Sequence, residues 1–161
     1  MKSWSDEDFA LPEGVKKGIE LGLRFERPTK IQAFAIPMIC QAPYGNLIAE
    51  SKNGSGKTGA FVVGSVLRVD PTIKGTQVIV VCNAKVMVTQ IAGIYKSLCE
   101  HAGISVIDTT EEAGTDAHIV VCTVGKMKAL QSGKKRIKFD KLKVLVFDEA
   151  DVYFSDAETV D

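Results

Sequence analysis

The chain has 161 residues, of which 45% are hydrophobic, enough for one domain that buries roughly two thirds of the surface of its unfolded chain. Its 20 Lys and Arg residues balance its 20 Asp and Glu residues, so no overall field draws it to nucleic acid or to an anionic membrane. Any nucleic-acid binding must therefore come from a local patch. The four cysteines and two histidines show no metal-ligand spacing, which favours reduced thiols over zinc or disulfides.

No apolar run reaches the roughly 18 residues of a membrane span, and the N-terminus has no signal-peptide pattern. We therefore expect an intracellular, soluble protein without a membrane partner.

Helical and strand patterns alternate along the chain. Helices are expected near 12–22, 29–41, 57–69, 85–101 and 124–131. Strands are expected at 46–49 and near 77–82, 104–107, 117–122 and 142–147. Continuous apolar strands that alternate with helices form parallel sheets buried on both faces. The sequence therefore predicts an α/β fold, with a parallel sheet covered by helices on both faces.

A loop suited to phosphate, Ser51–Thr58, joins the expected strand at 46–49 to the helix at 57–69. Gly54 and Gly56 allow successive N–H groups to converge, the helix N-terminus adds partial positive charge, and Lys57 adds a full one. Thr58 offers a hydroxyl to a magnesium ion on the β- and γ-phosphates. Ser51 occupies the first glycine position of G-x-x-x-x-G-K-[ST], and a solvated turn could share this composition.

Two carboxylates, Asp148 and Glu149, follow the apolar run at 142–147. They therefore fall at the carboxyl end of a buried strand, where ligands bind in open α/β sheets. Asp148 could hold Mg²⁺ directly or through a water, and Glu149 could polarise an attacking water. An acidic helix N-terminus would explain the charge but not the partner loop. We therefore select Lys57, Asp148 and Glu149 as catalytic candidates.

These motifs resemble those of the DEAD-box RNA helicases, whose name residues 148–151 spell. The family motif A-x-x-G-x-G-K-T is similar to Ser51–Thr58, with Ser at its first place, and the segment Gly22–Gln32 resembles the adenine-reading Q motif. A Gln amide offers the donor and acceptor that N6 and N7 of adenine require. The resemblance implies bound ATP or ADP with Mg²⁺. The implied nucleotide-binding residues are Trp4, Arg27, Gln32, Ser51, Gly54, Ser55, Gly56, Lys57 and Thr58, and the implied metal ligands are Thr58 and Asp148.

The family also stacks an aromatic side chain on adenine, upstream of the Q motif. Trp4 and Phe9 both lie near the expected place, and their spacing does not decide between them. Trp4 is the preferred candidate, with Phe9 expected in the core beside Leu11. Phe25 is expected to pack in the protein and not to bind ligand.

Two further segments resemble the family's RNA-binding motifs more weakly. The segment 83–88 stands where the family has P-T-R-E-L-A, and 123–126 stands where it has T-P-G-R. Gly114 alone stands in the stretch of the family's glycine doublet. The resemblance implies that single-stranded RNA is held through its sugar-phosphate backbone by Lys85, Thr123, Gly125 and Lys126. Lysine replaces arginine at both basic positions, which keeps the charge but loses the bidentate fork.

The resemblance implies a RecA-like P-loop domain, with a Q-motif region and N-terminal helices at 1–41 and the core at 42–161, together one structural domain. In the family this domain continues past the D-E-A-D motif to an S-A-T motif, whose strand lies between the phosphate-loop strand and the D-E-A-D strand. We therefore expect a longer polypeptide. A second RecA-like domain supplies arginine fingers in the family, so the 161 residues alone are expected to bind nucleotide without useful turnover.

The function implied for the complete protein is that of an ATP-dependent RNA helicase that remodels RNA or ribonucleoprotein. The alternative is a nucleotide-binding interaction module that keeps the ATP site but has lost productive coupling to RNA. The weak motifs at 83–88 and 123–126 keep this alternative open. The segment Ala42–Asn46 resembles the branch that remodels messenger RNA at nuclear pores, which implies a cytoplasmic or nuclear location.

Overall fold

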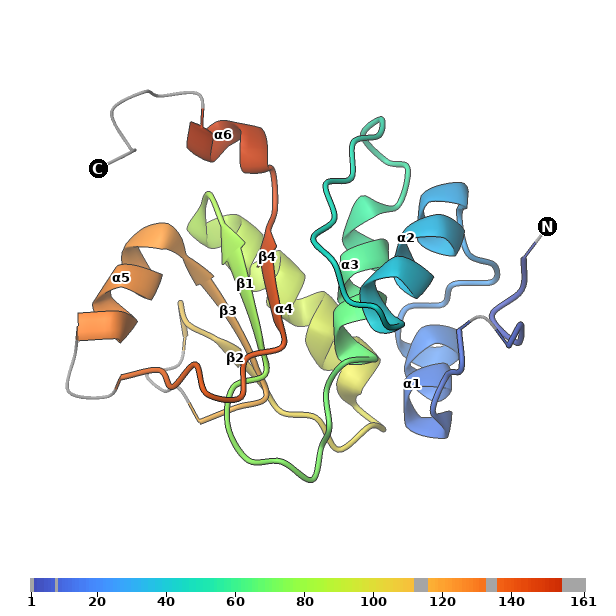
Figure 1. Cartoon of the computed structure of the whole chain (residues 1–161), viewed down its shortest axis with the longest axis horizontal. Helices are drawn as coiled ribbons and strands as arrows, with labels where there is room; N and C mark the ends of the chain where they lie inside the picture. The colour runs from blue at the N-terminus through green and yellow to red at the C-terminus, as the bar shows by residue number, and fades with distance from the viewer. Residues whose placement is uncertain (1, 8, 112–115, 133–135, 155–161) are drawn as a thin grey trace. The chain divides into compact units, whose positions relative to one another are not determined.

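The computed structural model describes residues 2–7, 9–111, 116–132 and 136–154 (Figure 1). The chain divides into two compact units, residues 1–73 with 94–105 and residues 74–93 with 106–161. These units run across the predicted boundary after residue 41, which stays a prediction. In the described part of the chain, no helix has the length and apolar character needed to cross a membrane.

The first unit is mainly helical. Its elements are α1 (Glu13–Lys17), the π-helix η1 (Gly18–Gly22), α2 (Lys30–Cys40), α3 (Lys57–Val66) and the end of α4 (Lys85–Cys99). α2 packs along α3, and the close approach is possible because Gly64 has no side chain: a Cβ there would lie 2.9 Å from Cδ1 of Ile39. The contact closes a core in which Ile36, Val62 and Val66 are buried.

A buried hydrogen bond ties α3 to the end of α4 in the same unit. The hydroxyls of Ser65 and Tyr95 lie 2.7 Å apart, and Ser65 also donates to the carbonyl of Val62 over 3.1 Å. Tyr95 therefore donates to Ser65, and both hydroxyl protons of this buried pair are used. The helix that carries the phosphate loop is thus fixed from its far end.

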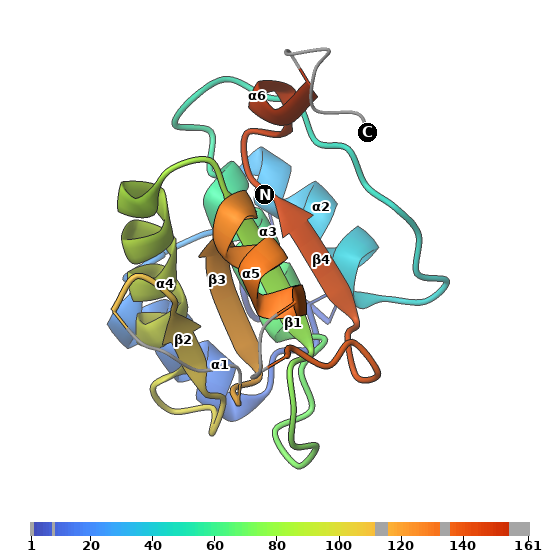
Figure 2. The same ribbon diagram turned by 90° about the vertical axis from the view of Figure 1, so that its left-hand side faces the viewer.

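The second unit is a parallel sheet with helices. Its strands are β1 (Val78–Cys82), β2 (Val106–Asp108), β3 (Ile119–Thr123) and β4 (Val144–Phe147), in the order β2-β3-β1-β4. α5 (Val124–Ser132) lies across β1 and β3 (Figure 2), and α6 (Ala150–Phe154) follows β4. Residues of β1 and β3 are buried on both faces of the sheet, so the predicted α/β fold is confirmed.

The prediction of a strand at 46–49 is wrong. The segment is extended but forms no strand, and the side chain of Ile48 is 97% exposed. Among the described residues no neighbouring strand supplies it with ladder hydrogen bonds, and a lone strand is not stable in water. In α3, Phe61 is only partly buried, whereas Val63 is fully buried.

Candidate functional site

The phosphate loop, Ser51–Thr58, has the backbone that its glycines predict. Gly54 and Gly56 have φ angles of 75° and 100°, in the left-handed region that residues with a side chain rarely adopt. Gly56 is the N-cap of α3, so Lys57 and Thr58 begin the helix directly after the turn. The unpaired N–H groups of this first turn and the helix dipole point toward the loop, an arrangement that favours an anion.

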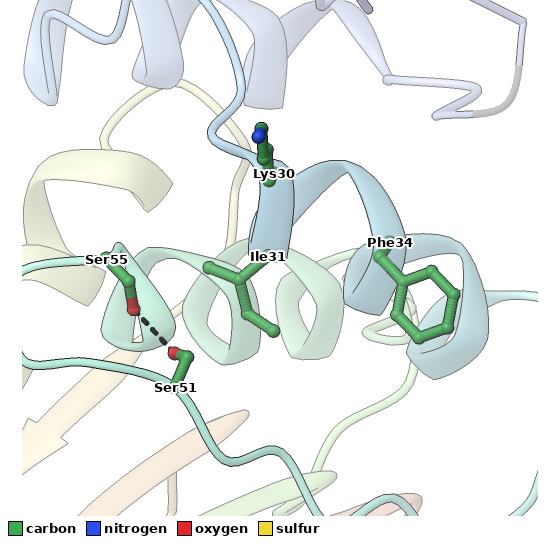
Figure 3. Close-up of a pocket in the computed structure, with 5 residues that line it drawn as sticks. All are labelled: Lys30, Ile31, Phe34, Ser51 and Ser55. Atoms are coloured by element: carbon green, nitrogen blue, oxygen red, sulfur yellow. Dashed lines mark hydrogen bonds between the residues drawn. The ribbon is translucent and has the colours of Figure 1, made fainter.

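Within the loop, Ser51 takes part in two contacts. Its hydroxyl lies 2.6 Å from that of Ser55 (Figure 3), and its carbonyl accepts a hydrogen bond from the Lys57 ammonium. Lys57 also donates to the carbonyl of Lys52 over 3.3 Å. The serine that replaces the first glycine of the motif therefore links the two ends of the loop. The Lys57 ammonium, which is predicted to bind phosphate, is bound to carbonyls of the loop itself.

Gln32 links the Q-motif segment to the phosphate loop. It forms a capping box at the start of α2, in which its Oε1 accepts from the backbone N–H of Thr29 over 2.9 Å. Its Nε2 donates to the carbonyl of Gly56 over 3.2 Å. A Cβ on residue 59 would overlap this Nε2, so the amide can reach the loop only because Gly59 has no side chain. One amide hydrogen and one lone pair of Gln32 remain for a further partner.

The two aromatic candidates for adenine stacking are both buried. Trp4 is 5% exposed and Phe9 1%, and their ring centroids lie 5.3 Å apart. Phe25 stacks on Trp4 at 6.4 Å with an interplanar angle of 16°, as expected for a packing residue. Phe9 is therefore in the core as predicted. The rings offer little free face in this conformation, and the stacking role of Trp4 stays a prediction.

A separate pocket of about 500 Å³ borders the phosphate loop (Figure 3). It is lined by Lys30, Ile31, Phe34, Ser51 and Ser55. Phe34 belongs to the part of the lining that α2 supplies, and it is 66% exposed. The pocket shares Ser51 and Ser55 with the phosphate loop, but its lining includes neither Gln32, the candidate reader of adenine, nor Lys57, so we do not assign the nucleotide to it.

The carboxylates Asp148 and Glu149 lie where the sequence predicts, directly after β4. The backbone N–H of Asp148 donates to the carbonyl of Val81 over 3.1 Å, which extends the pairing with β1. Glu149 has a φ of 52°, a left-handed conformation that costs a non-glycine residue about 1 to 2 kcal/mol. Its Oε2 accepts a hydrogen bond of 2.7 Å from Nδ2 of Asn83. The turn thus presents the second carboxylate in a defined orientation.

Tyr153 supports this turn from α6. Its hydroxyl donates to the carbonyl of Val81 over 3.3 Å. Burial raises the pKa of the Tyr153 phenol, and the nearby Cys82, Asp148 and Glu149 add to the effect. The phenol is therefore protonated at any physiological pH and keeps its donor.

The described residues contain no cluster of three or more His, Cys, Asp or Glu side chains that could hold a metal. Mg²⁺ needs no such cluster, because it is usually held by one or two protein oxygens together with substrate phosphates and water. Thr58 and Asp148 offer oxygen ligands of that kind, and their metal-binding role stays a prediction.

Three of the four predicted RNA-binding residues meet in one pocket of about 270 Å³, the lysine–threonine pocket. It is lined by Lys85, Thr109, Thr110, Thr123 and Lys126. The Thr123 hydroxyl accepts from the backbone N–H of Lys126 over 3.3 Å and so caps α5. Gly125 is not part of the lining, but it is exposed on the first turn of α5, where a Cβ would meet nothing.

Sequence reasoning did not select Thr109 and Thr110. Both follow β2, whose buried Asp108 accepts hydrogen bonds from the backbone N–H and hydroxyl of Thr110 over 2.8 and 2.6 Å. The signal was an Asp-Thr-Thr turn at the carboxyl end of an expected strand, where parallel sheets place ligands. Asn83 and Gly59 were also missed. Gly114 lies outside the described residues.

The four cysteines are free thiols. Burial raises the pKa of Cys82 and Cys99 to about 12 and that of Cys122 to about 11, and it also raises the pKa of Cys40. These groups are thiols and not thiolates at neutral pH, so they are poor nucleophiles.

Comparison with known proteins places these motifs in one family. A family model described as DEAD/DEAH box helicase matches residues 29–160. The DEAD-box ATP-dependent RNA helicase 38 of Arabidopsis thaliana is 38% identical over 156 residues, which cover 90% of this chain and 31% of that protein. The ATP-dependent RNA helicase DBP5 of Yarrowia lipolytica is 33% identical over 150 residues, covering 90% and 30%. The chain thus spans about a third of the length of the curated relatives it matches.

Solved structures show the same fold. Dbp5 of Saccharomyces cerevisiae bound to RNA and ADP BeF3 matches with a TM-score of 0.85 and 27% identity, over 99% of this chain and 41% of that chain. A variant of the same yeast protein bound to a Gle1 variant and IP6 matches with a TM-score of 0.84 and 26% identity, over 99% and 41%. The predicted RecA-like fold is therefore confirmed.

Proposed function

The chain belongs to the DEAD/DEAH box helicase family, and from this premise we propose that it is the ATP-binding first core domain of an ATP-dependent RNA helicase. The observation that carries the proposal is the pairing of two motifs in one chain. A glycine-built phosphate loop opens α3, and a carboxylate pair follows β4 at the carboxyl end of a parallel sheet. One motif binds phosphate and the other acts on water and metal.

In this proposal separate residues bind the phosphates, the metal ion and the attacking water. Lys57 exchanges its contacts with the loop carbonyls for the β- and γ-phosphates, and the N–H groups at the start of α3 bind the same oxygens. Thr58 and Asp148 would hold Mg²⁺, and the bound ion would neutralise charge on the phosphates. Glu149 orients the attacking water and accepts its proton.

Gln32 is proposed to choose adenine. Its remaining amide hydrogen matches N7 of adenine, and its remaining lone pair matches the N6 amino group. Guanine keeps N7 but presents the acceptor O6 in place of N6, which leaves the lone pair of Gln32 unsatisfied. The residue is only 3% exposed, and its amide contacts the phosphate loop at the carbonyl of Gly56. We expect ADP to bind more tightly than GDP and Gln32→Ala to relax this preference. Equal affinities for ADP and GDP in a titration of the unmodified protein would refute the assignment.

The lysine–threonine pocket is the proposed contact with single-stranded RNA. Two ammonium groups and three hydroxyls line it, and such groups suit a phosphate backbone more than base edges. The yeast Dbp5 structure with RNA and ADP BeF3 supports this proposal by its likeness. A place in the branch that remodels messenger RNA at nuclear pores, and thus a cytoplasmic or nuclear location, is a further part of it, supported by the DBP5 relatives.

The alternative is a nucleotide-binding interaction module without RNA coupling. It is favoured by the loss of both motif arginines, at Lys85 and Lys126. The two functions are separated by phosphate release from ATP, with and without single-stranded RNA, at matched salt. We expect RNA to stimulate release from the full-length protein, and we expect negligible release from the 161 residues alone, because the family's arginine fingers come from a second RecA-like domain. ATP binding with no RNA stimulation of the full-length protein would establish the alternative.

A further inference from the structure

Asn83 and Glu149 are joined by a hydrogen bond that the family motif does not predict. Nδ2 of Asn83 donates to Oε2 of Glu149 over 2.7 Å. The family motif P-T-R-E-L-A has proline at the position of Asn83, and a proline side chain has no polar atom to offer. The contact therefore depends on a residue in which this chain departs from the motif.

The sheet explains why the two side chains meet. Val81 of β1 and Phe147 of β4 are partners in the parallel register. Asn83 and Glu149 each lie two residues beyond these partners, so both leave the carboxyl edge of the sheet from neighbouring strands. Asn83 and Glu149 lie just beyond the ends of their strands, and the pairing of β1 with β4 continues as far as the N–H of Asp148, which donates to the carbonyl of Val81. The register thus brings an amide donor to the carboxylate.

The backbone of Glu149 is fixed independently of this contact. Its φ is 52°, and its carbonyl accepts from the N–H of Val152 over 3.0 Å at the start of α6. The side chain beyond Cα is exposed and has several rotatable bonds. Within the described part of the chain, Asn83 is the residue that donates a hydrogen bond to this carboxylate. Backbone geometry sets where the side chain starts, and Asn83 sets where its oxygens lie.

We propose that Asn83 is a positioning residue for the Glu149 carboxylate, an inference that rests on the proposed ATPase function. Asn83 occupies Oε2 and leaves Oε1 to accept a hydrogen bond from the attacking water. In the reaction the water oxygen bonds to the γ-phosphorus while the bond from that phosphorus to the bridging oxygen breaks. The bonding pair leaves with ADP, and the proton of the water passes to Oε1.

The chemistry of the donor suits this role. An amide is neutral, so it orients the carboxylate without adding a cation that would reduce its attraction for the water's proton. A catalytic group must be held close to its productive geometry, and small displacements lower the rate of the chemical step more than substrate binding. Loss of Asn83 should therefore lower kcat and leave KM and nucleotide affinity almost unchanged.

The test uses the full-length protein that contains this chain. We expect Asn83→Leu, which keeps the approximate size but removes the donor, to lower RNA-stimulated kcat about fivefold to tenfold, with the Kd for ADP within about twofold of the unmodified protein. Asn83→Asp places a second carboxylate beside Glu149 and should lower kcat at least as much. Asn83→Gln keeps the amide and should recover a large part of the rate. Gln131→Leu, an exposed amide on α5, is the matched control and should change nothing.

A kcat for Asn83→Leu within about twofold of the unmodified protein would overturn the proposal. So would an equal loss in Asn83→Gln accompanied by a lower melting temperature, since that pattern belongs to a purely structural role. A readout independent of activity is the side-chain ¹⁵N–¹H₂ resonance of Asn83, which should shift on Glu149→Gln. If it does not shift, the contact is not formed in solution. Absence of RNA-stimulated turnover in the unmodified protein would instead reject the proposed function, while the resonance still decides the contact.

Discussion

The phosphate loop and the lysine–threonine pocket are both candidate sites for phosphate groups, but they are built differently. The phosphate loop is made of backbone: left-handed glycines, a helix N-terminus and one lysine. The lysine–threonine pocket is made of side chains at or just beyond the ends of three strands, β1, β2 and β3. The first therefore depends on the absence of side chains at fixed positions, and the second on the presence of suitable ones.

This difference explains why the first motif is easy to find in the sequence and the second is not. A backbone site requires glycine where φ is positive or where another residue comes close, so its sequence pattern is strict. A side-chain site can exchange arginine for lysine, or gain a threonine, and still present charge and hydroxyls in one place. The weak motifs at 83–88 and 123–126 thus indicate substitution and do not by themselves indicate loss of a site.

The largest expected effect separates hydrolysis from binding. In the full-length protein we expect Glu149→Gln to slow RNA-stimulated hydrolysis by about two orders of magnitude or more, because the amide cannot accept the proton of the attacking water. Its affinity for ADP should change little. Lys57→Ala should weaken nucleotide binding, because it removes the positive charge that would attract the phosphates. Phosphate release and ADP titration measure the two effects, with Glu100→Gln as an exposed control. Unchanged turnover in Glu149→Gln would mean that another residue acts on the water.

A pair of glycine substitutions tests the contrast between the two kinds of site. In Gly59→Ala the new Cβ would displace the Gln32 amide from the carbonyl of Gly56, and loss of one such hydrogen bond, about 1 kcal/mol, should weaken ADP binding about fivefold. In Gly125→Ala the new Cβ meets nothing, and we expect unchanged ADP affinity with a gain of about 0.5 kcal/mol in the free energy of unfolding. If both variants bind ADP equally well, the phosphate loop does not depend on this close approach.

Most of the fold could be predicted from the sequence. The strands near 77–82, 104–107, 117–122 and 142–147 and the helices near 85–101 and 124–131 appear close to their expected places, because their apolar runs are long and their ends carry turn residues. The short helix α6 after β4 was not predicted. The absence of a strand at 46–49 could not be predicted in this way. Composition alone indicates a strand there, but a strand also needs a hydrogen-bonded neighbour, and its pairing is not visible in four residues.

The candidate site was predictable where a motif fixes residue identity and less so where contacts decide. The phosphate loop and the Asp148–Glu149 pair follow from their spacing. The burial of Trp4 under Phe25 does not, because an aromatic residue near a motif can stack on a ligand or on another ring with the same sequence signal. Asn83 was passed over as a departure from the family pattern, although the register of β1 and β4 places it beside Glu149.

The smallest expected effect concerns the lysine–threonine pocket and is read from salt dependence. Each single-stranded phosphate contact that is removed should lower the slope of log affinity against log salt by about 0.7. We therefore expect Lys85→Ala and Lys126→Ala in the full-length protein each to weaken RNA binding about threefold near physiological salt and to reduce the slope by about that amount. Lys128→Ala, on the same helix as Lys126 but outside the pocket, should leave the slope almost unchanged. The three variants are compared by titrating single-stranded RNA over a salt series. If Lys128→Ala reduces the slope as much as Lys126→Ala, the helix contributes only diffuse charge, and the pocket is not a phosphate site comparable with the loop.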